Sequence, residues 1–157
     1  RYIGTTAGSG GSSSTAGTVI QSFVCDETIA AGEVVRLVTS ADSPGFTNPG
    51  RIVKAIATTT ADQTYEAIGV ANGAGSAGNT IDVVFNGARN LTFAVAPTTA
   101  QIGKPIYLSA STTGRPTLTA PTASSTAVVK IGKILAANGS DVSVKCKIDV
   151  ELIAIIA

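Results

Sequence analysis

Residues 142–157 read VSVKCKIDVELIAIIA, and this stretch decides the fold. Apolar and polar side chains alternate through its first half, which is the two-residue period of a β-strand. β-Branched residues, which favour strands over helices, supply most of its apolar positions. The stretch therefore predicts one long strand, and it gives the pattern to look for in the rest of the chain.

The rest of the chain repeats this pattern in shorter pieces, separated by turns rich in Gly, Pro and Asn. Helix signals are weak and limited to single turns at 58–67 and 98–101. Many short strands joined by such turns predict an all-β fold, a small β-barrel or β-sandwich. We expect the further strands at residues 18–25, 34–39, 51–58, 67–71, 80–86, 91–95, 105–109 and 128–135.

The two halves of the chain resemble each other. The segments that correspond are 68–71 (IGVA) with 131–134 (IGKI), 80–85 (TIDVVF) with 142–146 (VSVKC), and GEVV from Gly32 with GKPIY from Gly103. Two pseudo-repeated halves would let two half-sheets close on each other and cover their edges. Chance similarity between strands rich in Val and Gly is the alternative.

The N-terminal stretch differs from the rest in composition. Residues 4–17 read GTTAGSGGSSSTAG and contain no side chain able to form a core. We therefore divide the chain into an extended N-terminal arm, 1–17, and a β domain, 18–157. The arm is either a flexible tail or a segment that becomes ordered against a neighbouring subunit, anchored there by Arg1, Tyr2 and Ile3.

The composition argues against an enzyme. The chain of 157 residues has no His, Trp or Met, and 13% of its residues are charged. His is the side chain most often used in acid–base catalysis, because its unperturbed pKa lies near neutrality. The neighbouring carboxylates Asp149 and Glu151 share a strand face with Lys145 and Lys147, which indicates a charge-balanced ladder. We expect no catalytic residue.

Ligand-binding motifs are equally weak. Residues 73–78 (GAGSAG) fit the dinucleotide pattern G-x-G-x-x-G, but a strand rather than a helix follows them, so we interpret them as a hairpin loop. The turn acids Asp26 and Asp42 lack the spacing of a calcium loop. Two cysteines, Cys25 and Cys146, are too few to hold a structural zinc ion. We expect no metal and no cofactor.

The net charge and the hydrophobicity of the chain limit which classes of partner it can bind, and its cysteines bear on whether it contains a disulfide. The net charge is +1, from 11 basic and 10 acidic residues, so no long-range field attracts nucleic acid or anionic lipid. No apolar stretch approaches the roughly 18 residues of a membrane-spanning helix. Cys25 and Cys146 lie in apolar strands, which favours buried free thiols, with a disulfide between the first and last strands as the alternative. We expect neither a nucleic-acid nor a membrane partner.

The succession of strands led by glycine resembles one family of phage proteins. The segments that carry the resemblance are IAAGEVV at 29–35, AIGVA at 67–71, GNTIDVV at 78–84, GKPIYL at 103–108 and IGKIL at 131–135. These segments are similar, in the same order, to short glycine-led motifs of the capsid decoration (cement) proteins of tailed bacteriophages. The similarity covers residues 28–152.

The resemblance implies a structural virion protein without enzymatic activity. Such a protein lies on the outer surface of an icosahedral capsid, is assembled in the host cytoplasm, and is often a homotrimer. It stabilises the head by bridging neighbouring subunits of the major capsid protein. A second hypothesis is an adhesion module of a phage tail fibre or bacterial surface that binds a host receptor or glycan. A small hydrolase is the third.

A protein of this kind needs arms and strand edges that pair with its neighbours. The strand at 18–25 and the stretch at 148–157 are the candidates. The run from Leu152 onward, LIAIIA, carries no charge, so an isolated edge there would aggregate. We expect it to be a central strand or, in preference, to be buried against another subunit. The candidate interface residues are Arg1, Tyr2, Ile3, Val19, Ile20, Phe23, Leu152, Ile153, Ile155 and Ile156.

Overall fold

The computed structural model describes residues 17–40, 42, 45–59 and 64–157. Their regular structure is β-structure apart from one 3-10 turn, η1 (Thr99–Gln101), so the prediction of an all-β, barrel-like fold is confirmed. The expected N-terminal arm lies outside the described residues except for Gly17. The strands are β1 (Val19–Val24), β2 (Val34–Leu37), β3 (Ile52–Lys54), β4 (Ala67–Ala71), β5 (Thr80–Thr92), β6 (Pro105–Leu108), β7 (Pro116–Thr117), β8 (Thr126–Ile134) and β9 (Ser143–Ile156).

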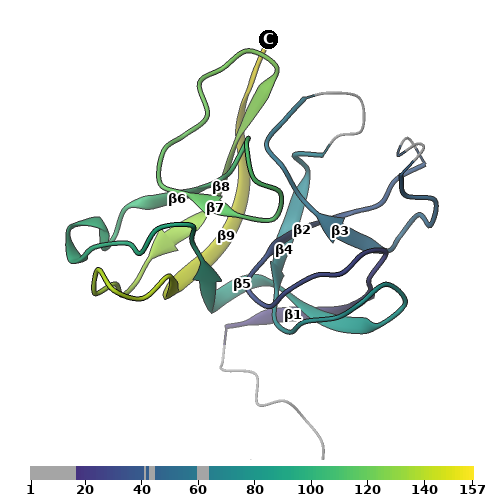
Figure 1. Cartoon of the computed structure of the whole chain (residues 1–157), viewed down its shortest axis with the longest axis horizontal. Helices are drawn as coiled ribbons and strands as arrows, with labels where there is room; N and C mark the ends of the chain where they lie inside the picture. Colours follow the sequence, from purple (N-terminus) through teal and green to yellow (C-terminus); the bar gives the residue numbers. More distant parts are fainter. Residues whose placement is uncertain (1–16, 41, 43–44, 60–63) are drawn as a thin grey trace, which may run out of the picture.

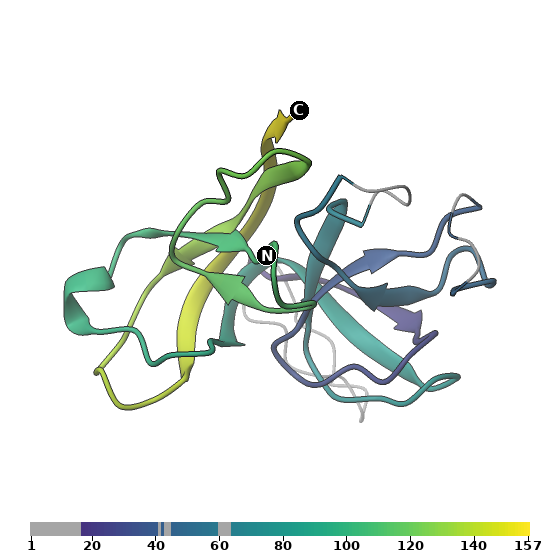
Figure 2. The same cartoon turned by 45° about the horizontal axis from the view of Figure 1, so that its top comes forward.

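The strands form one antiparallel sheet in the order β3-β2-β4-β5-β9-β8-β6-β7, with β1 paired to β5. Figure 1 shows that β5 crosses between two lobes, one holding β1 to β4 and the other β6 to β9. Figure 2 shows the same division from a second angle. A bridge from Cys25, after β1, to Ile52 in β3 curls the first lobe into a nearly closed ring. We call these lobes the first and second units.

The two units share one pairing register. In the first unit Val35 of β2 lies opposite Gly69 of β4, and the register shifts directly after Val35. In the second unit Ile106 of β6 lies opposite Gly132 of β8, and the register shifts directly after Ile106. A shared register with a shared irregularity is what a pseudo-repeat predicts and is hard to reach by chance. The two-halves prediction is therefore confirmed in the pairing of the strands.

The turns that lead into β2 and β6 are also equivalent. Gly32 and Gly103 both have φ of +81°, a conformation that glycine adopts without strain. The Gly32 N–H donates to the Ala71 carbonyl at 2.9 Å, and the Gly103 N–H donates to the Ile134 carbonyl at 2.8 Å. Each glycine thus ties the start of one strand to the end of the strand beside it.

The first unit is buried on both faces of its sheet. Val34 and Val84 face the main core, which the two units share, while Val35 and Val83 face a smaller core inside the first unit. Neighbouring residues of a strand point to opposite faces, so two buried faces require consecutive apolar residues. This explains why the valines of these strands come in pairs rather than in alternation with polar residues.

The main difference from the predicted elements concerns β5. The sequence predicts two strands, 80–86 and 91–95, but the structure has one continuous strand. Gly87, at φ +126°, lets the strand bend and change partners without ending. A Cβ at Gly87 would also lie 2.7 Å from Thr18 Oγ1, so only glycine fits there. The expectation that all strands except the last are short is therefore wrong for β5.

Smaller differences occur in the loops. β3 ends at Lys54 rather than continuing to 58, and the two-residue strand β7 was not predicted. The turn expected at 98–101 is η1, whose first N–H, on Thr98, donates to Gln101 Oε1 at 2.7 Å. The turn expected at 58–67 lies partly outside the described residues. Residues 73–78 do form the loop of the β4–β5 hairpin, as the sequence predicts.

Candidate functional site

The last six residues of β9 have an unusual position in the sheet. β5 pairs with β9 up to Asp149, which lies opposite Asn86, and then turns away. From Glu151 to Ile156, β9 pairs with β8 alone among the described strands. We call residues 151–156 the β9 end; both views place it at the outer tip of its lobe (Figures 1 and 2). Its second edge has no strand beside it within the described chain.

The β9 end exposes apolar side chains on both faces. Leu152, Ile153 and Ile155 are 50%, 52% and 55% exposed, although most large apolar residues of the chain are buried. Because successive residues of a regular strand point to opposite sides, Ala154 and Ile155, which pair with β8 in unbroken register and are both exposed, leave both faces of the β9 end uncovered. Among the described residues the β9 end is therefore an edge and not a central strand, and burial against another subunit stays a prediction.

The equivalence of the two units shows which role a strand in the position of the β9 end has. The residue after β1, Cys25, donates its N–H to the Asn79 carbonyl at 2.8 Å, next to the start of β5. The residue after β5, Phe93, donates its N–H to the Val142 carbonyl at 2.8 Å, next to the start of β9. The second half of β5 (residues 86–92) thus pairs with β9 as β1 pairs with β5. Each unit is completed by the strand that precedes it.

The β9 end follows the second unit as the second half of β5 follows the first. The second half of β5 completes the next unit, and its Leu91 and the following residue, Phe93, are buried there. The described chain has no third unit for the β9 end to complete. It therefore has the position of a completing strand and the apolar side chains of a buried one, without a partner in the described chain.

The other predicted interface residues lie in two kinds of surroundings. Val19 is 56% exposed and pairs with Asn86, whose other neighbour is Asp149 just before the β9 end. Ile20 and Phe23 are half-buried against the two cores, so they contribute mainly to packing. Ile156 is half-buried. The predicted contacts Arg1, Tyr2 and Ile3 lie outside the described residues.

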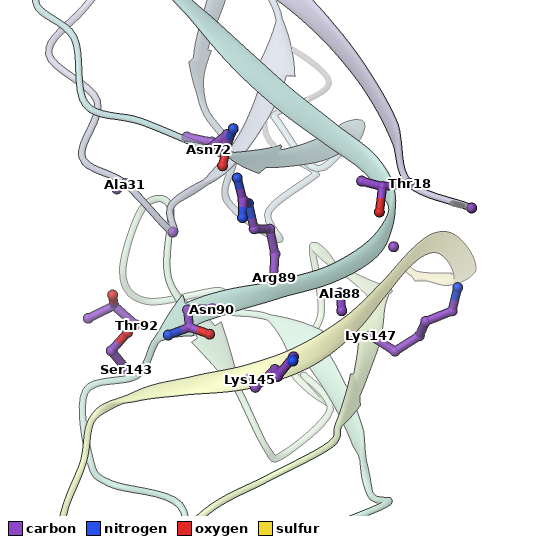
Figure 3. Close-up of a pocket in the computed structure, with 14 residues that line it drawn as sticks. Thr18, Ala31, Asn72, Ala88, Arg89, Asn90, Thr92, Ser143, Lys145 and Lys147 are labelled. Carbon is purple, nitrogen blue, oxygen red and sulfur yellow. The ribbon is translucent and has the colours of Figure 1, made fainter. Parts of the chain in front are cut away.

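A second feature is a cleft of about 800 Å³ beside the bend of β5. Figure 3 shows Arg89 extending from β5 toward Asn72, with Lys145 and Lys147 following one another along β9. Arg89 is not predicted from the sequence, because residues 87–90 look like a loop between two strands. The sequence predicts a ladder of Lys145 and Lys147 with Glu151, but Glu151 pairs with Lys130 of β8 at 3.3 Å instead.

Several acids singled out in the sequence take part in ion pairs. Asp26 lies 3.4 Å from Arg51, and Asp42 lies 2.8 Å from Arg36 in a pair that is almost fully buried. Within the ranges that the structure describes, no three His, Cys, Asp or Glu side chains come together as metal ligands would. The acids at these turns therefore stabilise loops.

The two cysteines are free and buried in different cores, so the disulfide alternative is wrong. Burial raises the pKa of the Cys146 thiol to about 12. Burial, and then the negative charge of Glu27, raise the pKa of the Cys25 thiol. Both thiols therefore stay protonated near neutrality and behave as small apolar side chains.

The comparisons with known proteins give no family. No protein-family model matches the chain, and no curated protein matches it either. In the described part of the chain no helix is long and apolar enough to cross a membrane. The function is therefore argued from the β9 end, the cleft and the residues around them.

Proposed function

We propose that this protein is a structural virion protein. It decorates an icosahedral phage capsid from the outside and stabilises it by bridging neighbouring subunits of the major capsid protein. It acts without catalysis, cofactor, nucleic acid or membrane, and it assembles as a homotrimer. The observation that carries the proposal is the β9 end, a strand with two exposed apolar faces and an edge that no described strand covers. The resemblance of the glycine-led strands to decoration proteins supplies the capsid as the partner.

The energetics favour a covered β9 end. Full burial of a Leu or Ile side chain contributes about 1.5–3 kcal/mol, and these three side chains are already about half covered. The remaining burial is therefore worth roughly 1 kcal/mol for each. This is less than the cost of association, estimated at about 4 kcal/mol or more. Stable attachment needs several such contacts at once, which a symmetric oligomer on a repeating capsid surface supplies.

The described acids support the absence of catalysis. Asp26, Glu27 and Asp42 are paired with Arg51, Lys54 and Arg36. Burial would raise the pKa of Asp42, but the hydrogen bonds from Arg36 and Thr39 hold it below its ordinary value, so this carboxylate is poorly suited to take up a proton from a substrate. The chain has no His to take that role.

The second candidate is an adhesion module of a phage tail fibre or bacterial surface, and the polar cleft beside β5 is the observation that favours it. An adhesin would bind its receptor in this cleft, and that binding would not require the β9 end. The two functions therefore place their essential residues on different surfaces, which makes them separable by substitution.

The experiment is sedimentation with heads of a tailed phage that lack their decoration protein. We expect the protein to sediment with the heads. The triple variant Leu152→Ser, Ile153→Ser, Ile155→Ser should remain in the supernatant. The matched control Val95→Ser, Val142→Ser removes exposed apolar side chains elsewhere and should sediment like the unchanged protein. A protein that ignores heads but binds host cells or glycans would overturn the proposal in favour of adhesion.

A further inference from the structure

We infer that the cleft beside the bend of β5 binds an acidic peptide segment of a partner protein. This inference goes beyond the proposed function, because it concerns a different surface and holds for any partner that presents such a segment. It is carried by the shape of the cleft, by its charge and by two buried polar atoms in its wall.

The cleft is large enough for a peptide. Its volume of about 800 Å³ lies within the range of ligand-binding pockets, about 300–1,000 Å³. It forms where β5 leaves the first unit, so elements of both units line it (Figure 3). Gly87 lines the cleft at the bend of β5 and has no side chain to narrow it. The lining residues that can hydrogen-bond a ligand through an uncharged side chain are Thr18, Asn72, Asn90, Thr92 and Ser143.

The charge of the lining has one sign. Among the described residues that line it, Arg89, Lys145 and Lys147 are charged and none is a carboxylate. The ion pairs found among the described residues involve none of these three cations. Lys147 instead donates to the neutral Asn86 side chain at 2.8 Å. Cations gathered in a cleft reinforce one another's field and attract an anionic ligand.

Two polar atoms in the wall of the cleft indicate which class of anion the cleft binds. Arg89 Nε and Asn72 Oδ1 are buried, and neither has a hydrogen-bond partner among the described atoms, whereas buried polar atoms are almost always satisfied. Arg89 Nε requires an acceptor, and carboxylates and phosphates both fit the arginine fork. Asn72 Oδ1 requires a donor, which a peptide N–H supplies. An acidic peptide offers both groups.

A nucleic acid fits less well. Its phosphate backbone offers acceptors but no N–H donor for Asn72. Single-stranded nucleic acids bind by stacking their bases on aromatic side chains, and none of the described residues that line the cleft is aromatic.

The test is fluorescence anisotropy with a labelled polyglutamate peptide, and with a polyglutamine peptide of equal length as the uncharged probe. We expect salt-sensitive binding of polyglutamate alone. The variant Lys145→Gln, Lys147→Gln should weaken binding about three- to ten-fold, which is the range for two partly exposed charges. Arg89→Lys keeps the charge but loses the fork, and should also weaken binding.

The matched control is Lys104→Gln, Lys130→Gln, which removes two cations outside the cleft and changes the net charge equally. Equal weakening by the control, or equal binding of polyglutamine, would overturn the inference. Tighter binding of an oligonucleotide, or full competition by inorganic phosphate, would also overturn it in favour of another anion. A protein that sediments with heads but ignores polyglutamate would overturn this inference alone and leave the proposed function standing.

Discussion

Among the ion pairs of the described residues, that of Arg36 and Asp42 has both side chains almost fully buried. Arg36 Nη2 lies 2.8 Å from Asp42 Oδ1, and the Thr39 N–H donates to Asp42 Oδ2 at 2.6 Å. Burial alone would raise the pKa of the Asp42 carboxyl, but the hydrogen bonds from Arg36 and Thr39, together with the charge of Arg36, outweigh it. The pKa of Asp42 is therefore below its ordinary value, and the carboxylate holds the β2–β3 loop to its strand.

This pair predicts a dependence of stability on pH. Because the pKa of Asp42 is lower in the folded protein than in the unfolded chain, the stabilisation is present at neutral pH and is lost as the pH falls below about 4. Asp42→Asn should lower the free energy of unfolding by about 3 kcal/mol at neutral pH and flatten its decline in acid. Urea unfolding at a series of pH values measures both effects. The exposed control Asp149→Asn should leave the acid decline unchanged, and an Asp42→Asn protein as stable as the parent would contradict this account.

The two thiols give a second prediction at this scale. Both are buried with raised pKa values, so neither should react with a thiol reagent such as Ellman's reagent in the native protein at mildly alkaline pH. Both should react at once in denaturant. Rapid labelling of either cysteine in the native state would show that its core opens readily.

At the scale of the elements, two glycines set how closely the strands approach. A Cβ at Gly69 would lie 2.5 Å from the Val84 carbonyl oxygen, and one at Gly132 would meet the carbonyl oxygen of Lys147. These positions are equivalent in the two units. The close approach of backbones is therefore a property of the repeat, and it keeps each unit tightly curled.

We predict that Gly69→Ala and Gly132→Ala each lower the free energy of unfolding by at least about 2 kcal/mol, because the neighbouring strand must shift. Gly73→Ala is the matched control, since a Cβ there meets nothing within 4 Å and Gly73 has no positive φ. Chemical denaturation of the three variants compares them. If only one of the two variants Gly69→Ala and Gly132→Ala had a lower free energy of unfolding, the glycine at the other position would have a different role.

The elements also show where sequence reasoning succeeds. β4 and β9 follow directly from period and β-branching, and the repeat follows from paired segments such as IGVA and IGKI. β5 could not be predicted as one strand, because residues 87–90 look like a loop and their pairing with β9 is decided by tertiary contacts. The cleft was missed for the same reason, since its cations come from two strands that are distant in sequence.

On the scale of the whole molecule, the chain consists of two equivalent units and one strand end beyond them. β1 completes the first unit, and the second half of β5 completes the second. The β9 end has the same position after the second unit and is apolar on both faces. The sequence identified Leu152, Ile153 and Ile155 as interface candidates from their lack of charge. It could not show that they are uncovered, because exposure depends on where β5 turns away.

The central claim is that the β9 end assembles the protein with its neighbours. The most direct measurement is the mass in solution by light scattering after size exclusion, for the unchanged protein and for the triple variant Leu152→Ser, Ile153→Ser, Ile155→Ser. The account predicts a particle of three chains that shifts onto undecorated phage heads, and a folded single chain for the variant. A single chain for the unchanged protein that also ignores heads would contradict the claim.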